Sequence, residues 1–363
     1  MLARPNLWWS LRLPWSHPHD LSGMVNSCVS GFVEMEYRRV GNSNLRISEL
    51  SLGAWLTYAE KGEKVARECI RAAFEAGVNS FDNADVYGKG RAETIMGTVL
   101  KNLRRSDLII ASKVFYDMAP GPNDRGLSRK HIMESCDGSL RRLNTDYLDI
   151  YYFHGFESEQ LGVLNPNMEE AVRAMDDLVR QGKILYWAVS NWDTAQIARA
   201  WGLADKWMLY KPVAVQPEYH MFQRSPVETD LGRLAGDLGF GLMTYSPLNH
   251  GILTGKYNDG IPADSRFANP HHEWRHLRRS LTQEKIDRVR KLTKVAEGVG
   301  GTVTQLAIAW LLRLPQVSSV IVGASSLSQV EENLKSLELK NRLTPDVLER
   351  IENILGNKPQ LAL

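Results

Sequence analysis

The stretch from Leu148 to Asn191 decides the fold. It opens with the apolar run Leu148-Asp-Ile-Tyr-Tyr-Phe-His154 and continues through Met168–Gln181, where apolar residues recur at helical spacing. It then returns to a second apolar run, Leu185-Tyr-Trp-Ala-Val-Ser-Asn191. Two short apolar runs separated by an amphipathic helix are typical of a strand–helix–strand unit, in which the two strands lie parallel. The stretch therefore predicts a parallel sheet.

The same alternation continues on both sides of this stretch. Six further apolar runs are expected to be strands: Leu50–Gly53, Ser80–Asn83, Leu108–Lys113, Val213–Pro217, Gly241–Ser246 and Val320–Gly323. Helical spacing recurs between them at Glu63–Ala76, Arg129–Leu143 and Thr194–Ala204. Eight strands alternating with helices predict an α/β fold, and eight is the number that closes a (β/α)8 TIM barrel. An open doubly wound sheet is the alternative.

Turn and cap residues support the element boundaries. Glu36–Val40 and Leu45–Glu49 flank Gly41-Asn-Ser-Asn44, which predicts an N-terminal β-hairpin. Ser128 is a predicted N-cap, and Gly77 and Gly182 are predicted helix stops.

After the seventh strand, a long loop runs to a helix predicted near Thr282–Glu297. It contains Gly251, Gly255, Gly260, Pro262 and Pro270. So long a connection beside a strand end indicates a functional loop or lid.

Residues 1–34 differ from the regular barrel sequence expected over 35–363. They contain three tryptophans and no acidic residue before Asp20, and neither helical nor strand spacing is evident. A targeting segment is one interpretation, because basic residues precede apolar ones. A poorly ordered extension, or a true start at Met24 or Met35, is the other. The domain boundary is therefore predicted near residue 35.

Composition excludes several classes of function. Forty-four basic and 42 acidic residues give a net charge of +2, so no nucleic-acid partner is indicated. No apolar run is long enough to predict membrane insertion. The three cysteines form no CxxC pair, which favours inert thiols in a reducing, cytoplasmic compartment. His272-Glu-Trp-Arg-His276 matches H-E-x-x-H, but it lies in the long loop, so no metal site is predicted.

Polar residues gather where the second, third and fourth strands end. Asp82, with Tyr87 five residues later, follows the second strand, Lys113 ends the third and His154 ends the fourth. Each has a plain structural explanation by itself, as a turn aromatic, a turn cap or a satisfied core histidine. In an α/β barrel, however, the carboxyl ends of the strands form the active site. The four side chains are therefore expected to lie together.

These residue types suit the reduction of a carbonyl. Hydride addition leaves an alkoxide that needs a proton, and a tyrosine, with a reference pKa near ~10, is a weak acid at neutral pH. A lysine ammonium lowers that pKa, and a carboxylate keeps the lysine charged and oriented. A histidine can donate a hydrogen bond to the carbonyl oxygen. Tyr87 is therefore predicted to be the general acid, with Lys113 and Asp82 tuning it and His154 orienting the substrate.

The motifs around these residues resemble the aldo-keto reductase family. They are Phe81-Asp-Asn-Ala-Asp-Val-Tyr-Gly88, Ser112-Lys113, Asp149-Ile-Tyr-Tyr-Phe-His154, Tyr245-Ser-Pro-Leu248, Gly323-Ala-Ser-Ser326 and Gln329 with Glu332-Asn333. The resemblance covers about residues 36–357. Within the family, Gly251-Ile-Leu-Thr-Gly-Lys-Tyr257 is most similar to the potassium-channel beta subunits and their bacterial relatives. The animal channel subunits have Asn where this chain has His154, and histidine is the pattern of the competent reductases.

The resemblance implies NADP (NADPH) as the cofactor. It places Ser190, Asn191 and Gln216 at the nicotinamide carboxamide and Tyr245 against the ring. Other implied cofactor contacts, several of them to phosphate, are Trp55, Ser246, Pro247, Leu248, Gly251, Lys256, Arg266, Gly323, Ser325, Gln329, Glu332 and Asn333. The cations among them suit phosphate, and the basic pair Lys256 and Arg266 favours NADP over NAD. Ordinary solvated loop charge is their alternative role.

The leading hypothesis is an NADPH-dependent oxidoreductase that reduces aldehydes or ketones. It would act on a small carbonyl substrate without a metal. An apolar substrate pocket is predicted from Trp55, Phe115, Phe156 and Trp192, for which barrel-end packing is the alternative. The rival hypothesis is a regulatory subunit that binds NADP and docks onto a channel, with slow turnover. A third is a dehydrogenase that runs in the oxidative direction. The channel-subunit resemblance also suggests a homo-oligomer, with a tetramer as its expected form.

Overall fold

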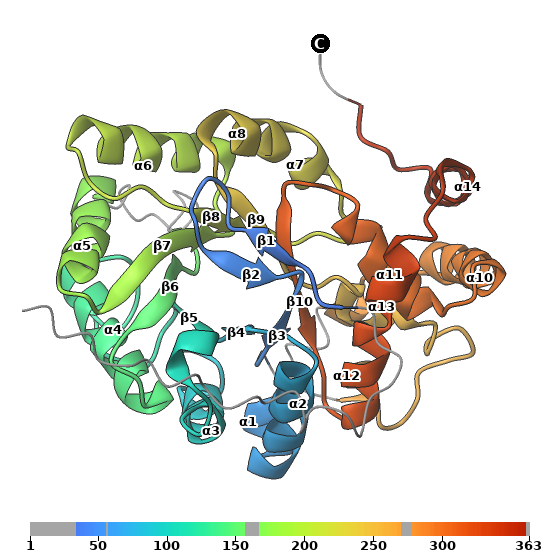
Figure 1. The fold of residues 1–363 in the computed structure, drawn as a ribbon, viewed down its shortest axis with the longest axis horizontal. Coiled ribbons are helices and arrows are strands. Elements are labelled where there is room, and N and C mark those ends of the chain that lie inside the picture. The colour runs from blue at the N-terminus through green and yellow to red at the C-terminus, as the bar shows by residue number, and fades with distance from the viewer. Residues whose placement is uncertain (1–33, 56, 157–166, 270–276, 361–363) are drawn as a thin grey trace, which may run out of the picture. The chain divides into compact units, whose positions relative to one another are not determined.

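The computed structural model describes residues 34–55, 57–156, 167–269 and 277–360. Eight parallel strands close into a barrel in the order β10-β3-β4-β5-β6-β7-β8-β9 (Figure 1). They are β3 (Leu50–Gly53), β4 (Ser80–Asp82), β5 (Ile109–Val114), β6 (Leu148–Phe153), β7 (Ile184–Ser190), β8 (Ala214–Gln216), β9 (Gly241–Thr244) and β10 (Val317–Gly323). The predicted (β/α)8 TIM barrel is confirmed, and the open-sheet alternative is wrong.

The strand boundaries differ from the predicted ones by up to three residues. The largest difference is at β10, which begins at Val317 instead of Val320 because its first residues include Ser318 and Ser319. Both serines are buried, and the Ser319 hydroxyl lies 2.7 Å from the hydroxyl of Ser51 on β3. Two buried serines that hydrogen-bond to each other across neighbouring strands interrupt the apolar pattern, so the pattern alone does not assign them to a strand.

The predicted hairpin is also present, as β1 (Tyr37–Arg39) and β2 (Arg46–Ser48), paired antiparallel. Figure 1 shows it lying across one end of the barrel. Val40 and Ile47 are fully buried and pack with barrel residues that include Ile109, the first residue of β5. The hairpin therefore covers the amino-terminal ends of the strands and leaves the carboxyl ends for chemistry.

Gly41 fixes the hairpin to the barrel and gives the first prediction. Its φ is +55°, and a Cβ there would lie 2.4 Å from the Gly239 carbonyl oxygen. We expect Gly41→Ala to destabilise the fold by at least the ~1–3 kcal/mol of backbone strain, plus the cost of the clash. Gly182 has φ +70°, and a Cβ there would meet nothing within 4 Å, so Gly182→Ala is the matched control for strain alone. In urea denaturation, the midpoint of Gly41→Ala should be clearly lower than that of Gly182→Ala. Equal midpoints would contradict the close contact of Gly41 with Gly239.

Helices surround the barrel. Those of the described segments are α1 (Tyr58–Lys61), α2 (Glu63–Glu75), α3 (Arg91–Leu100), α4 (Arg129–Leu143), α5 (Met168–Arg180), α6 (Thr194–Lys206), α7 (Ser225–Glu228), α8 (Asp230–Leu238), α10 (Gln283–Gly298), α11 (Val303–Leu312), α12 (Leu327–Leu334), α13 (Ser336–Lys340) and α14 (Pro345–Leu355). Ser128 caps α4 by accepting the His131 amide, as predicted. Gly77 and Gly182 follow α2 and α5 with positive φ, also as predicted.

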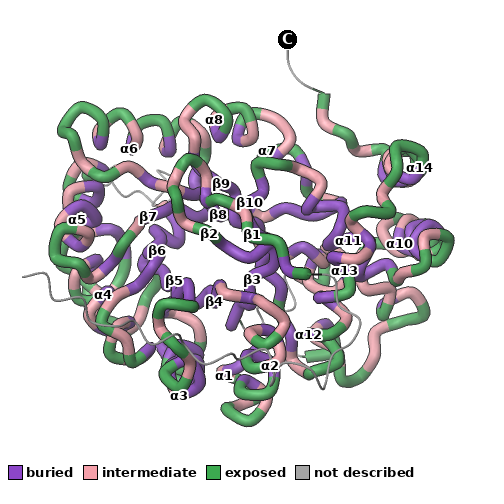
Figure 2. Tube along the Cα trace, viewed as in Figure 1, coloured by how far each residue is buried: buried purple, intermediate pink, exposed green. Residues whose placement is uncertain are grey.

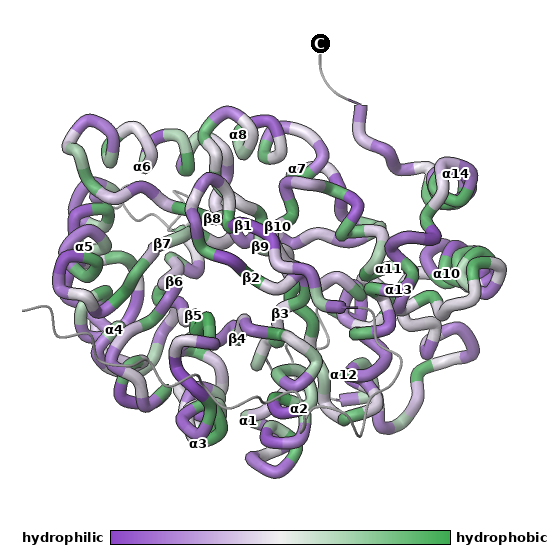
Figure 3. Tube along the Cα trace, viewed as in Figure 1, coloured by the Kyte–Doolittle hydropathy of each residue, from purple (hydrophilic) through white to green (hydrophobic). Residues whose placement is uncertain are grey.

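The helices bury one face against the strands. Figure 2 shows buried strands at the centre and exposed outer helix surfaces, and Figure 3 shows the apolar residues concentrated on the inner side. The exception is α11, which is buried along its whole length under α10, α12 and α13. No single helix of the described residues is long and apolar enough to cross a membrane, although the sharply bent pair α10 and α11 passes the length and composition criteria together.

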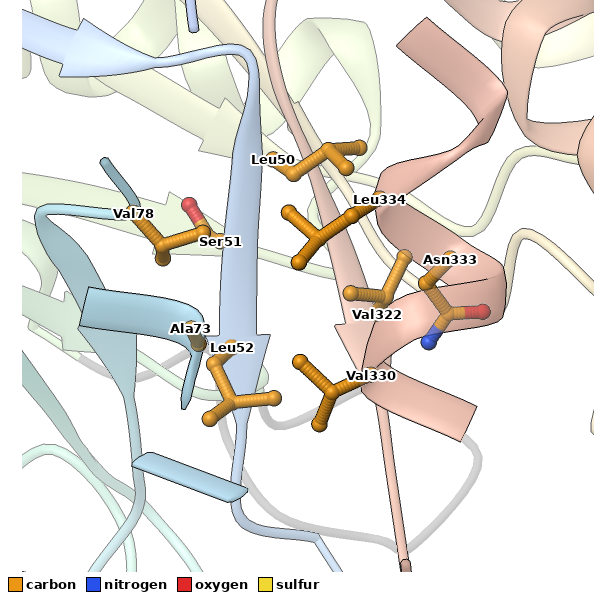
Figure 4. Close-up of a pocket in the computed structure, with 9 residues that line it drawn as sticks. All are labelled: Leu50, Ser51, Leu52, Ala73, Val78, Val322, Val330, Asn333 and Leu334. Carbon is orange, nitrogen blue, oxygen red and sulfur yellow. The ribbon is translucent and has the colours of Figure 1, made fainter. Parts of the chain in front are cut away.

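A small cavity lies in the wall of the barrel, not at its mouth. Apolar side chains from β3, β10, α2 and α12 line it, with Asn333 at one side (Figure 4). Its volume is about 10 Å³, which is room for one water molecule at most. It cannot hold a cofactor or a carbonyl substrate.

Candidate functional site

Three of the predicted catalytic side chains meet at one buried ammonium group. The Lys113 Nζ donates to the Asp82 Oδ2 at 2.5 Å, to the Asn83 carbonyl oxygen at 2.7 Å and to the Tyr87 hydroxyl at 3.4 Å. Lys113 is fully buried on β5, and Asp82 ends the neighbouring strand β4. The other oxygen of Asp82 accepts from the Gln216 amide at 3.0 Å. The carboxylate is thus held from two sides and can fix the lysine beside the tyrosine.

His154 joins this group through its ring. It follows β6, and its ring centroid lies 5.6 Å from that of Tyr87 in an edge-to-face arrangement. Burial, and then the charge of Lys113, hold the pKa of His154 well below its ordinary value. The imidazole is therefore neutral at physiological pH and can donate one hydrogen bond.

The charges around Tyr87 act in opposite directions. Burial, and next the Asp82 carboxylate, raise the pKa of Tyr87 well above its ordinary value, so the lowering expected from Lys113 is outweighed. Burial also lowers the pKa of Lys113, which Asp82 opposes. The phenol consequently keeps its proton over the physiological range, which is the state that a proton donor requires.

A second carboxyl lies close behind this group. Asp85 is fully buried, and neither of its carboxyl oxygens has a hydrogen-bond partner among the described residues. Burial, and then the nearby Glu93 carboxylate, raise the pKa of Asp85 to about 8. Glu93 is itself bound by Arg142 at 2.6 Å and by the Ser112 hydroxyl at 2.5 Å. Asp85 is therefore largely a neutral acid at pH 7.

This raised pKa predicts a pH-dependent stability. An acid whose pKa is higher in the folded than in the unfolded chain destabilises the fold progressively between the two values, here from about pH 4 to about pH 8. Asp85→Asn removes the ionisable group and with it this loss of stability. The melting temperature of Asp85→Asn minus that of wild type should therefore be larger at pH 7.5 than at pH 4.5. Thermal denaturation of both proteins at the two pH values measures this. A difference that does not change with pH would contradict a buried neutral Asp85.

The residues expected at the nicotinamide lie at the same carboxyl end of the barrel. Asn191, at φ +60°, accepts from the Tyr245 hydroxyl at 2.8 Å and donates to the His154 carbonyl at 3.3 Å. Ser190 donates to the Gln216 carbonyl at 2.9 Å. These side chains come from the ends of β7, β8 and β9, so the structure brings all four together with the predicted catalytic side chains.

The predicted phosphate loop after β9 has an unusual backbone. Ser246, Asn249, His250 and Gly251 all have positive φ, and the last three begin a segment of 3-10 helix, η4 (Asn249–Thr254), that is broken by a kink at His250 and Gly251. Runs of this kind turn backbone N–H groups toward a common point, which is an anion-binding arrangement. Pro247 and Leu248 lie within it. Two amides of the loop donate within it, Asn249 to the Ser246 carbonyl and Gly251 to the Leu248 carbonyl. We call residues 246–251 the cradle, and binding of an anion by them stays a prediction.

Two cations lie beside this cradle. Lys256 lies against Gly251, where a Cβ would meet its Cε at 2.9 Å. The Arg266 guanidinium lies over the Trp55 ring at 5.6 Å. Burial lowers the pKa of each. Trp55 lies two residues after the end of β3, so its contact places Arg266 at the carboxyl end of the barrel.

The remaining predicted cofactor residues gather at the start of α12. Gln329 accepts from the Ser325 amide at 2.8 Å, and Asn333 donates to the Gly323 carbonyl at 3.2 Å. The helix begins at Leu327, with Ser326 as its N-cap. Glu332, by contrast, accepts from Thr302 and Gln305 at the start of α11. The Glu332 side chain is therefore held toward the start of α11 and not toward Ser325 and Gln329.

The predicted pocket residues separate into two kinds. Trp192 is only 5% exposed, stacks on Phe153 with centroids 5.5 Å apart and packs edge-on against Phe156. Phe115 is buried as well, which favours barrel-end packing for both. Trp55, 36% exposed, remains accessible to a ligand. Sequence reasoning missed Tyr116, which is 43% exposed and lies edge-on to His154 at 5.1 Å.

The other candidate chemistries have little support. The H-E-x-x-H stretch at 272–276 falls outside the described residues, and within the described ones no cluster of histidine, cysteine or acidic groups is arranged to hold a metal. Cys69 and Cys136 are buried free thiols. Burial raises their pKa values to about 11 and about 12, so neither is a reactive thiolate.

Comparison with known proteins agrees with this geometry. Residues 49–355 match the Aldo/keto reductase family, a family of oxidoreductases. A "Probable voltage-gated potassium channel subunit beta" of Arabidopsis thaliana is 45% identical over 90% of this chain and 98% of its own. The protein of the same description from Oryza sativa subsp. japonica is 44% identical over the same shares. The chain belongs to the aldo/keto reductase family.

Proposed function

We propose that the chain is an NADPH-dependent oxidoreductase that reduces aldehyde or ketone carbonyls to alcohols. The observation that carries the proposal is the contact of one buried ammonium, Lys113, with both the Asp82 carboxylate and the Tyr87 hydroxyl. A barrel that only bound a dinucleotide would have no need of this arrangement. The neutral His154 ring beside Tyr87 supplies the second donor that a carbonyl oxygen requires.

The residues at the barrel mouth suit the cofactor. Gln216, Ser190 and Asn191 offer amide and hydroxyl groups for the carboxamide, and Tyr245 offers a ring face. The loop from Ser246 to Gly251, which has positive φ at four of its residues, suits the diphosphate together with Lys256, and Arg266 with Ser325 and Gln329 suits the additional phosphate that distinguishes NADPH from NADH. Glu332 is the least supported of the predicted cofactor contacts, because its carboxylate already accepts hydrogen bonds from Thr302 and Gln305.

The chain's own groups perform the proton chemistry. When bound, NADPH supplies the hydride. His154 donates a hydrogen bond to the carbonyl oxygen and orients it, and Tyr87 gives its proton to the same oxygen as negative charge develops there. Lys113 stabilises the phenolate that remains, and Asp82 keeps the lysine charged. In the reverse direction the same groups remove a proton from an alcohol, so the residues suit oxidation as well.

The substrate side of the site is open and aromatic. We assign its wall to Trp55 and Tyr116, which are the exposed aromatic side chains next to Arg266 and His154. Apolar walls with few polar groups suit small carbonyl compounds. Phe115, Phe156 and Trp192 shape this wall from behind.

A regulatory role is the second candidate. The relatives above are described as potassium channel beta subunits, and the likeness extends over nearly their whole length. By this hypothesis the barrel binds NADPH, forms a homo-oligomer and docks onto a channel, turning over slowly. The two roles are compatible, and turnover separates them.

The test is oxidation of NADPH followed by nicotinamide absorbance with a panel of small aldehydes. We expect steady turnover by wild type and a fall of about 10²–10³-fold in kcat for His154→Asn, the size of effect found for one lost oxyanion donor. His131→Asn changes a buried histidine on α4 that has no contact with Lys113, Tyr87 or His154 among the contacts of the described residues, and as the control it should keep kcat near wild type. Tight NADPH binding without reduction of any aldehyde would favour the regulatory role.

A further inference from the structure

Two histidines share one carboxylate behind the predicted phosphate loop. The Glu218 Oε1 lies 3.4 Å from the His220 Nε2 and 3.5 Å from the His250 Nε2. The imidazole side chains are only 5% and 9% exposed. Glu218 and His220 follow β8, whereas His250 belongs to η4 after β9. The carboxylate therefore ties two neighbouring strand ends together.

His250 lies in a run of three residues with positive φ. Its φ is +56°, between Asn249 at +45° and Gly251 at +100°. A non-glycine residue in this region costs about 1–3 kcal/mol and persists only where its surroundings hold it. The contacts that hold His250 are Glu218 and the edge of the Trp55 ring, whose centroid is 5.9 Å away. The side chain thus fixes the backbone of the cradle.

The two imidazoles differ in their freedom to take a second proton. The His220 Nδ1 accepts the Phe222 amide at 3.1 Å, so this ring is satisfied as a neutral donor to Glu218. Burial lowers the pKa of His220 accordingly. The His250 Nδ1 has no hydrogen-bond partner among the described residues. His250 is consequently the member of the pair that protonation would change.

Charges of both signs surround the two imidazoles. Burial raises the pKa of Glu218, but hydrogen bonds from His220 and His250 outweigh burial and hold that pKa at about 2, so the carboxylate is charged at physiological pH. The other titratable or charged groups facing the cluster are Tyr245 after β9, Lys285 of α10 and, across Trp55, Arg266. Lys285 also acts on Glu218. An anion in the cradle would add to the attraction for a second proton on His250.

We propose that Glu218 and His250 are positioning residues for the cofactor's diphosphate loop, and that NADPH binds more tightly when His250 takes up a proton. The inference rests on the proposed function. In its neutral form His250 holds the loop by one hydrogen bond to Glu218. In its protonated form the bond becomes an ion pair, and the loop gains a positive charge beside the diphosphate.

The test is the dissociation constant of NADPH, measured by titration of its fluorescence between about pH 5.5 and 8.5, the range in which histidine changes charge. For wild type we expect affinity to rise by up to about tenfold as the pH falls, the change that one unit of coupled pKa shift produces. His250→Gln and Glu218→Gln should bind more weakly at low pH and lose most of this slope. Glu284→Gln, an exposed carboxylate on α10, is the control and should keep it.

The outcomes distinguish failure of this inference from failure of the proposed function on which it rests. NADPH also carries a phosphate that titrates, and a slope that survives unchanged in His250→Gln would belong to that phosphate and overturn the inference. A flat wild-type profile would overturn it as well. If wild type fails to bind NADPH at any pH, the proposed function itself is wrong. Glu218→Gln keeps a hydrogen-bond acceptor, so it carries the test if His250→Gln does not fold.

Discussion

Replacing Tyr87 by phenylalanine is expected to lower kcat by about 10²–10⁴-fold, the usual contribution of a positioned general acid. The reason is that the substitution removes one hydroxyl, the group that lies 3.4 Å from the Lys113 ammonium, and leaves the ring against His154 in place. NADPH affinity should remain near wild type, since no phosphate or carboxamide contact is lost. Steady-state kinetics with an aldehyde and a fluorescence titration of NADPH measure the two quantities.

Tyr116→Phe is the matched control for this result. Tyr116 also lies edge-on to His154, but it is half-exposed and its hydroxyl is far less enclosed. Its removal should change KM at most modestly and leave kcat close to wild type. Equal losses in the two variants would mean that neither hydroxyl is the specific proton donor, and a fully active Tyr87→Phe would remove Tyr87 from the mechanism.

Lys113→Met should have the largest combined effect on stability and activity. Removing the ammonium leaves the Asp82 carboxylate, whose side chain is only 8% exposed, without its ion-pair partner. Breaking a buried pair in this way destabilises a fold by about 3–5 kcal/mol. Turnover should be lost too, because nothing remains to stabilise the Tyr87 phenolate. Urea denaturation and aldehyde reduction measure the two losses.

The double variant Lys113→Met, Asp82→Asn separates the two effects. Neutralising Asp82 removes the unpaired charge, so most of the lost stability should return. Activity should not return with it. A double variant that is as unstable as Lys113→Met would show that the ammonium acts through packing, and one that regains turnover would exclude Lys113 from proton transfer.

The barrel was predictable from the sequence because parallel strands are buried on both faces. Runs such as Leu148–Phe153 are apolar almost throughout, and the helices between them carry one apolar stripe. The prediction failed where polarity was satisfied internally, as in the Ser319 and Ser51 pair of β10 and β3. Local patterns do not show which partner a buried serine will meet across the sheet.

The gathering of the proposed catalytic side chains was predictable for a different reason. Asp82, Lys113 and His154 are polar residues at the ends of strands, where a parallel barrel places its chemistry. Tyr116 gave no such signal, because an aromatic residue two positions after a strand looks like packing. The Glu218, His220 and His250 cluster was missed for another reason: its members follow two different strands, and only the closed barrel shows that β8 and β9 lie side by side.

The most direct test of reduction at this site is transfer of deuterium to an aldehyde from NADPH in which both hydrogens at C4 of the nicotinamide are replaced by deuterium. Mass spectrometry of the alcohol follows the label in wild type and in Tyr87→Phe. We expect an alcohol that carries one deuterium on the former carbonyl carbon in wild type, and almost no alcohol with Tyr87→Phe. An unlabelled alcohol, or none from a wild-type protein that binds NADPH, would contradict direct hydride transfer at this site.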